Sequence, residues 1–163
     1  MTYKIKTITT QTDYKGKSIF DRAADELLID ESFSMSPDDE EGTIETTLYG
    51  ELDSVQNKYV LSYEEETEGM GGVFTEVKFE KGKPDAVTIV RTGALDTYMY
   101  FEKGKRHVCV YNTGVMPFEI CIYAKDVNNK LLTEGYMEIT YLIEIKGACA
   151  QKTVMRMEIE RYD

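Results

Sequence analysis

Tryptophan is absent from this chain of 163 residues, histidine occurs once, and proline and cysteine occur three times each. One histidine and three scattered cysteines do not supply the four ligands of a zinc site at any familiar spacing. The glycine-rich stretch at 69–72 is not followed by a helical pattern, so it does not indicate a phosphate-binding loop. The sequence therefore predicts no metal site and no cofactor.

Long apolar runs are also lacking, since none approaches the roughly 20 residues that a membrane-spanning helix needs. The first ten residues lack the apolar segment and the cleavage site of a signal peptide. We therefore expect a cytoplasmic protein, in which Cys109, Cys121 and Cys149 are reduced, buried structural thiols.

Positive charge is scarce relative to negative charge, with a formal net charge of −11 and a pI of about 4.6. Such a surface repels phosphate backbones, so nucleic acids and anionic membranes are not expected partners. The acidic runs at 38–41 and 64–68 lack the ligand alternation of a calcium loop, and we interpret them as solvated faces.

The residues that are present predict one all-β domain over residues 1–163. Apolar and polar residues alternate with a period of two in several segments, which is typical of strands with one buried face. The alternation is clearest at 73–79, 137–145 and 155–159 and is imperfect at 4–12, where β-branched residues favour a strand. Strands are predicted at 4–12, 44–49, 59–63, 73–79, 87–91, 97–101, 106–111, 118–124, 137–145 and 155–159. Gly50 and Asn57 are expected to mark the bend between the second and third strands.

One segment near the N-terminus departs from this pattern. Ser18 is a candidate N-cap, and Phe20, Ala24 and Leu27 follow at helical spacing, so a short helix is expected. An acidic stretch with Pro37 and Gly42 then predicts a solvated loop. Residues of about 14–42 would form an insertion that carries this helix and loop.

Short connections between the strands require antiparallel neighbours. Regular short strands of this kind indicate a sandwich or an up-and-down barrel, and a barrel of about eight to ten strands is favoured because closure removes the exposed edges. The sequence leaves a Greek-key arrangement open. The pentapeptide F-E-K-G-K occurs at 79–83 and again at 101–105, with two strands between the copies. Both turns are therefore expected at the same end of the barrel, and their repetition is attributed to hairpin chemistry.

The hairpin around the second copy defines two faces if Glu102 to Lys105 form its turn. Met99 and Phe101 would then share a core face with Val108 and Val110. The opposite face would carry Tyr98, Tyr100, His107, Cys109 and Tyr111. A turn of odd length would reverse this assignment on one of the two strands.

Several runs of this chain resemble a known family. The runs are Y-V-L-S-Y-E-E-E from Tyr59, V-T-I-V-R-T-G from Val87, M-Y-F-E-K-G-K-R-H from Met99, Y-N-T-G from Tyr111 and I-T-Y-L-I-E-I from Ile139. In order and spacing they resemble the YwiB-like family of small, uncharacterised bacterial proteins. The resemblance implies a calycin-like, that is lipocalin-like, β-barrel from a bacterium of the Firmicutes kind, and it brings no known reaction or substrate.

The candidate ligand-binding residues are polar or aromatic side chains among the strands: Tyr63, Arg91, Arg106, His107 and Tyr111. Arg91 shares a strand face with Val87 and Ile89, so inside a barrel its guanidinium would need either Glu64 or Glu65 or an anionic ligand group. His107 could act as an acid or base beside Cys109, but side chains two apart on a strand are about 7 Å apart. No catalytic residue is therefore assigned.

Three functions remain as alternatives. The favoured one is non-enzymatic binding of a small, partly apolar ligand in the barrel or at its mouth. The second is a protein-interaction or homodimeric scaffold that uses Tyr98, Tyr100 and Tyr111 as a contact surface. The third is a hydrolase or isomerase that uses His107 and Cys109.

Overall fold

The computed structural model describes residues 1–13, 40–67, 71–93, 96–112, 118–145 and 148–162. Within these ranges the chain forms ten β-strands. They are β1 (Thr2–Asp13), β2 (Glu40–Val55), β3 (Lys58–Thr67), β4 (Gly71–Glu80), β5 (Ala86–Gly93), β6 (Asp96–Glu102), β7 (Arg106–Asn112), β8 (Phe118–Lys130), β9 (Tyr136–Ile145) and β10 (Ala148–Arg161). The described part contains no helix long and apolar enough to cross a membrane.

Each strand pairs in antiparallel fashion with its neighbour in the sequence, and β1 also pairs with β10, which closes an up-and-down barrel. The predicted all-β, antiparallel barrel is thereby confirmed. The helix expected after Ser18 lies at positions outside the described residues, as does most of the acidic loop. The insertion was expected to extend to about residue 42, but β2 already begins at Glu40.

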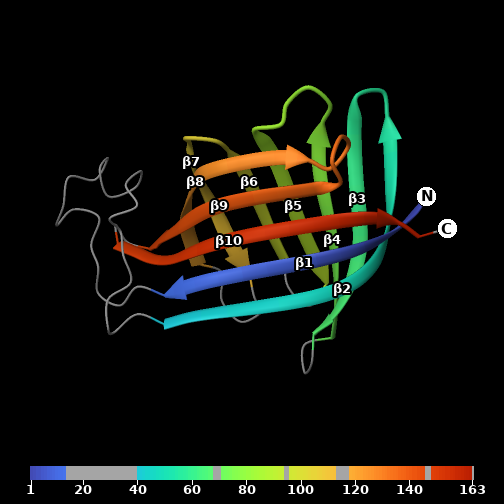
Figure 1. Ribbon diagram of the computed structural model, residues 1–163. Coiled ribbons are helices and arrows are strands. Elements are labelled where there is room, and N and C mark those ends of the chain that lie inside the picture. Colours follow the sequence, from blue (N-terminus) through green and yellow to red (C-terminus); the bar gives the residue numbers. More distant parts are fainter. Residues whose placement is uncertain (14–39, 68–70, 94–95, 113–117, 146–147, 163) are drawn as a thin grey trace.

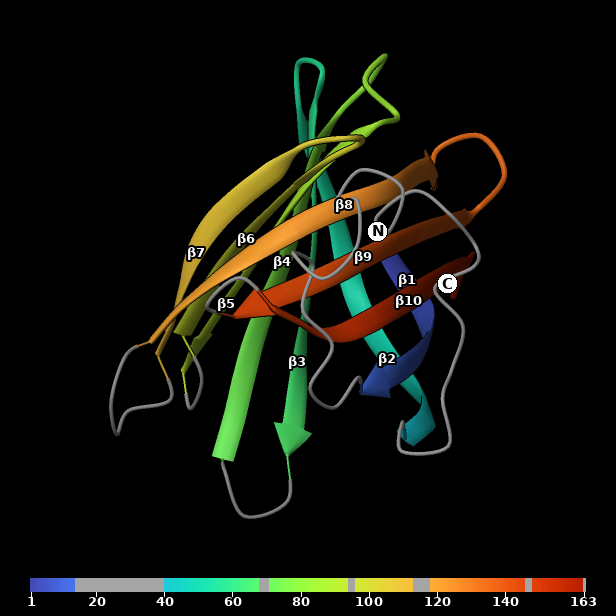
Figure 2. The same ribbon diagram turned by 90° about the vertical axis from the view of Figure 1, so that its left-hand side faces the viewer.

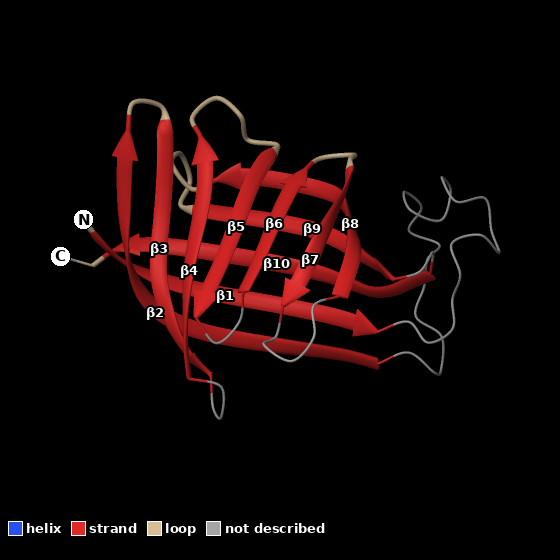
Figure 3. Ribbon diagram, turned by 180° about the vertical axis from the view of Figure 1, so that it is seen from behind, coloured by secondary structure: helices blue, strands red, loops and turns tan. Residues whose placement is uncertain are grey.

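The barrel is flattened into two layers whose strands cross at a steep angle (Figures 1 and 3). One layer holds β8, β9, β10 and β1, and the other holds β3 to β7, with β2 curving from the first layer into the second. Accordingly, the first part of β2 pairs with β1 and its last six residues pair with β3. Figure 2 shows the same crossing from the side.

Gly50 makes the corner in β2, at the point where this strand changes layers. A Cβ atom at Gly50 would lie 2.4 Å from the backbone oxygen of Ser62 and 2.8 Å from Cδ1 of Ile5. Only a residue without a side chain allows the layers to approach this closely. The prediction that Gly50 belongs to the bend between two strands was wrong, because the strand continues to Val55 and the turn occupies only Gln56 and Asn57.

The turns at one end of the barrel are joined by backbone hydrogen bonds. Lys81 donates to Asn57 (2.8 Å), Asn129 donates to Pro84 (2.9 Å), and Lys103 donates to Asp85 (3.0 Å). We call this end the hairpin end. Both copies of F-E-K-G-K turn here, as predicted from the meander, and their glycines have φ values of 88° (Gly82) and 80° (Gly104).

The side chains that point inward from β3 to β6 form rows across the strands, as the register defines. The row nearest the hairpin end contains Tyr59, Phe79, Val87 and Phe101, and the next contains Leu61, Val77, Ile89 and Met99. These residues belong to the hydrophobic core, together with Ile5, Met137, Ile139 and Met157 from the other layer, except that Tyr59 is partly buried and packs against the core. These two apolar rows therefore occupy the levels of the barrel nearest the hairpin end.

Candidate functional site

A polar row follows the two apolar rows. Tyr63 on β3 lies opposite Thr75 on β4, Thr75 lies opposite Arg91 on β5, and Arg91 lies opposite Thr97 on β6. We call these four residues the polar row. Tyr63, Thr75 and Thr97 are at most 5% exposed, and Arg91 is half-buried. Four adjacent strands thus place three hydroxyl groups and one guanidinium group at one level of the barrel.

Two polar atoms in this row are buried without a hydrogen-bond partner: Nε of Arg91 and Oγ1 of Thr97. Among the described residues Arg91 makes no ion pair, although Glu64 and Glu65 were the expected partners. The Glu65 carboxylate instead accepts a long hydrogen bond from Oγ1 of Thr75 (3.5 Å). Arg91 therefore lies on the inward face of its strand, and its guanidinium has no acidic partner among the described residues, although a purely structural role would require one.

The pKa of the Tyr63 hydroxyl depends on its neighbours in the polar row. Burial raises the pKa of its hydroxyl far above the ordinary value of 10, and the Glu65 carboxylate raises the pKa further. The Arg91 guanidinium and the Thr75 hydroxyl, which lie at the same level of the barrel, lower the pKa. At neutral pH the phenol is therefore a neutral hydrogen-bonding group.

Tyr111 belongs to the same level, because its backbone lies opposite Thr97. Its side chain lies outside the described residues. Of the five residues predicted to bind a ligand, the structure thus brings Tyr63 and Arg91 together and aligns the backbone of Tyr111 with them. Thr75 and Thr97 were missed, because threonine is an ordinary residue in strands and nothing in the sequence distinguishes these two.

Arg106 and His107 lie elsewhere, at the start of β7 next to the hairpin end. Nε of Arg106 donates to the carboxylate of Glu144 (3.1 Å), which is 5% exposed, and the guanidinium lies 4.5 Å from the centre of the Tyr123 ring. Arg106 is thus engaged in structural contacts and is separate from the polar row.

His107 stacks on Tyr100, with ring centres 4.7 Å apart and ring planes inclined by 20°. Its Nε2 atom is buried without a hydrogen-bond partner. The described backbone pairs between β6 and β7 are limited to Asp96 with Asn112 and Thr97 with Tyr111, so His107 itself has no described ladder partner on β6.

The register predicted for this hairpin was wrong by one residue. Thr97 lies opposite Tyr111 rather than Val110, because the turn between β6 and β7 has three residues, Lys103 to Lys105. An odd turn reverses the faces of the second strand. Met99 and Phe101 are in the core as predicted, but Val108 is 63% exposed and Cys109 is buried.

The environment of Cys109 disfavours a thiolate. Burial, and to a smaller extent the neighbouring thiol of Cys121, raises the pKa of Cys109 to about 11. Both cysteines are free thiols, and the side chain of Cys149 lies outside the described residues. Within the described part of the chain, no group of three or more histidine, cysteine, aspartate or glutamate residues could hold a metal ion.

Three grooves are lined by described residues, with volumes of about 330, 370 and 430 Å³. The first lies over β3 to β6, the second between the β4–β5 and β8–β9 hairpins, and the third beside Tyr136 and Arg156. None of these three is lined by Tyr63, Arg91 or Thr97. The polar row is thus defined by its buried, partnerless atoms rather than by a groove.

The family model of a domain of unknown function (DUF1934) matches residues 31–157. The chain belongs to this family. A crystal structure of the YwiB protein from Bacillus subtilis matches with a TM-score of 0.66 and 20% sequence identity, over 98% of this chain and 93% of that chain. The match confirms the resemblance to YwiB, and at this identity it carries the fold alone. No curated protein matches the chain.

Proposed function

We propose that this DUF1934 protein is a non-enzymatic binding protein for a small, partly apolar ligand that carries a negatively charged group. The observation that carries this proposal is the pair of partnerless buried atoms, Nε of Arg91 and Oγ1 of Thr97, on adjacent strands. A buried donor without an acceptor costs about 1–3 kcal/mol, and few native groups are left in this state. A ligand carboxylate could accept from both groups and offset this cost.

The apolar rows next to the polar row suggest the other part of the ligand. Ile89 and Met99 are the next inward residues on β5 and β6 toward the hairpin end, and both are buried. A ligand whose charged group meets Arg91 would place its apolar part against these side chains. Small barrels of calycin-like type hold a single ligand in this manner. Our proposal includes that this barrel is calycin-like and that the protein is cytoplasmic.

Calorimetric titration with dodecanoate tests the proposal, with dodecanol as the uncharged comparison. Arg91→Met should weaken dodecanoate binding roughly 10- to 100-fold, because charge-assisted hydrogen bonds contribute about 1.5–3 kcal/mol, and should leave dodecanol binding unchanged. Arg156→Met is the matched control, since Arg156 pairs with Glu138 and Glu158 on the outer face. Absence of dodecanoate binding, or equal binding by the Arg91→Met variant, would reject the proposal.

A homodimeric or protein-interaction role is the second candidate. It is favoured by two exposed side chains on the outer face of adjacent strands, Tyr98 on β6 (61% exposed) and Val108 on β7 (63% exposed). Light scattering after size exclusion should then show a dimer that Tyr98→Ser and Val108→Ser dissociate. A monomer at every concentration would count against a homodimer.

The absence of catalysis is also part of the proposal. With a pKa of about 11, Cys109 is almost entirely a protonated thiol at neutral pH, and a thiol is a much weaker nucleophile than a thiolate. His107 is engaged in a stack with Tyr100. These two observations argue against a hydrolase or isomerase that depends on His107 and Cys109.

A further inference from the structure

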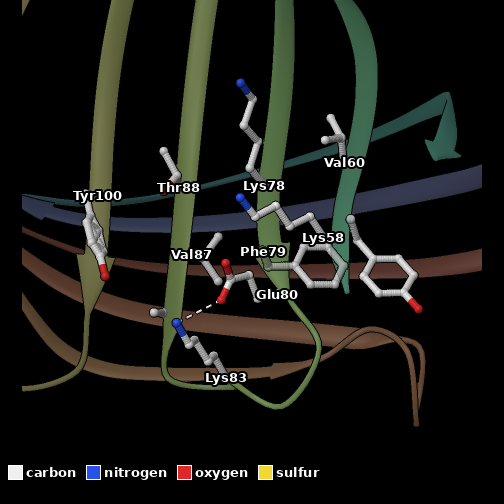
Figure 4. Close-up of a pocket in the computed structure, with 11 residues that line it drawn as sticks. Lys58, Val60, Lys78, Phe79, Glu80, Lys83, Val87, Thr88 and Tyr100 are labelled. Carbon is white, nitrogen blue, oxygen red and sulfur yellow. Dashed lines mark ion pairs between the residues drawn. The ribbon is translucent and has the colours of Figure 1, made fainter. Parts of the chain in front are cut away.

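The outer face of the barrel contains a groove of about 330 Å³ over β3 to β6 (Figure 4). The outward residues of β5 at this level, Ala86 and Thr88, are short. Longer side chains flank them, with Lys78 opposite Thr88 on β4 and Tyr100 opposite Thr88 on β6. The groove therefore follows from the sequence, as a row of small residues between two rows of long ones.

The charges that line this groove are mainly positive. Its lining contains three lysines, Lys58, Lys78 and Lys83, and one carboxylate, Glu80. Glu80 is engaged by Lys83, with a distance of 2.8 Å between Oε2 and Nζ. Lys58 and Lys78 make no ion pair with any residue in the described part of the chain. In a protein with a net charge of −11, this is a local excess of positive charge.

The opposite wall of the groove is an aromatic ring that is held in place. Tyr100 stacks on His107, and its hydroxyl donates to Oε1 of Glu102 (2.9 Å). Figure 4 shows Tyr100 on one side, Lys58 and Lys78 on the other, and Val87 and Thr88 between them. A fixed ring loses little conformational freedom when a ligand binds to it.

We infer that this groove binds a small organic phosphate that carries a flat ring, with the ring against Tyr100 and the phosphate between Lys58 and Lys78. Lysine is a common phosphate ligand, and aromatic rings attract each other in offset or edge-to-face arrangements. A volume of about 330 Å³ suits a single-ring compound. A nucleic acid would extend beyond the groove and meet the overall negative surface. This site is separate from the polar row inside the barrel.

Phenyl phosphate is the probe. Inorganic phosphate is the comparison without the ring, and benzoate is the comparison without the second negative charge. We expect saturable binding of phenyl phosphate in calorimetry, weakened by salt, and at least fivefold weaker binding of either comparison. In nuclear magnetic resonance spectra of the full chain, the amide signals of Ala86, Thr88 and Tyr100 should shift upon titration.

The decisive variant is Lys58→Gln combined with Lys78→Gln, which should weaken phenyl phosphate binding about tenfold, since each exposed ion pair contributes a few-fold. Lys81→Gln is the matched control, because Lys81 is at the same end of the barrel but lines a different groove. It should change the affinity less than twofold.

Three results would overturn the inference. One is the absence of both saturable binding and amide shifts at Thr88 and Tyr100 in the unaltered protein. Another is an equal loss of affinity in Lys81→Gln and in the double variant, which would indicate a general charge effect. The third is equal affinity for phenyl phosphate and inorganic phosphate, which would remove any role for Tyr100.

Discussion

Replacement of Arg91 by methionine should stabilise the fold, because the arginine is retained at a cost to stability. Its Nε atom is buried without a partner, and it has no acidic partner among the described residues. An unsatisfied buried donor costs about 1–3 kcal/mol, and partial exposure of this side chain places the cost near the lower limit. Methionine has a similar length and no polar atom, so we expect the free energy of unfolding to rise by about 1 kcal/mol.

Arg106→Met is the comparison variant, because the same substitution should lower the free energy of unfolding at this position. Arg106 is the partner of Glu144, whose carboxylate is 5% exposed, and its removal leaves a buried charge unpaired. Such losses cost about 3–5 kcal/mol at fully buried pairs. Because the Arg106 side chain is 40% exposed, we discount the expected loss to about 1–3 kcal/mol.

Urea unfolding followed by circular dichroism measures both variants. With a denaturant dependence of about 2 kcal/mol per molar urea, the two midpoints should differ by about 1–2 M, with the Arg91→Met midpoint above and the Arg106→Met midpoint below that of the unaltered protein. A loss of stability in Arg91→Met similar to that in Arg106→Met would refute the reasoning, since it would mean that Arg91 has structural partners after all.

The other predictions concern the barrel corner, the Tyr63 phenol and the Cys109 thiol. Gly50→Ala should lower the free energy of unfolding by about 1–3 kcal/mol because its Cβ would meet the backbone of Ser62. Gly42→Ala should change the urea midpoint little, because no atom lies within 4 Å of the added Cβ. Equal urea midpoints for Gly50→Ala and Gly42→Ala would contradict the close approach of Ser62 to Gly50. The folded-state pKa of Tyr63 is raised, so its contribution to stability is complete below pH 10 and is lost as the pH rises above 10. Tyr63→Phe should reduce the loss of stability between pH 9 and 11, and an unchanged loss would contradict the burial of the phenol. Iodoacetamide should label Cys109 slowly at pH 7.5 and faster toward pH 11, as followed by mass spectrometry, whereas rapid labelling at pH 7.5 would show an exposed thiolate.

Much of the fold could be predicted from local patterns. Period-two alternation placed Val77, Ile89 and Phe101 in the core, where each is fully or almost fully buried. Short connections implied the antiparallel meander, and the repeated pentapeptide implied that two turns share one end. These features depend only on neighbours in the sequence, so they can be read without knowledge of long-range contacts.

Features that depend on contacts between layers could not be predicted in this way. Gly50 has the sequence signature of a turn, yet it is a corner inside a long strand because Ile5 and Ser62 approach it from other strands. The faces of β7 were misassigned because one residue more or less in the turn before it exchanges Val108 with Cys109. A single residue of register is not determined by composition or periodicity.

The candidate site could be predicted only in part, because it too depends on strand register. Arg91 was selected because it shares a strand face with apolar residues, and Tyr63 was selected only as one of several polar or aromatic side chains among the strands. Their juxtaposition with Thr75 and Thr97 depends on three registers, those of β3 with β4, β4 with β5 and β5 with β6. The sequence alone leaves each of these registers open.

Native mass spectrometry of the protein purified from its natural host tests the central claim most directly. If the polar row anchors a ligand, the unaltered protein should carry an additional small mass under gentle conditions, and the Arg91→Met variant from the same host should lack it. If each of the two proteins instead shows the mass of its own polypeptide alone, the assignment of the polar row as a ligand anchor would be contradicted.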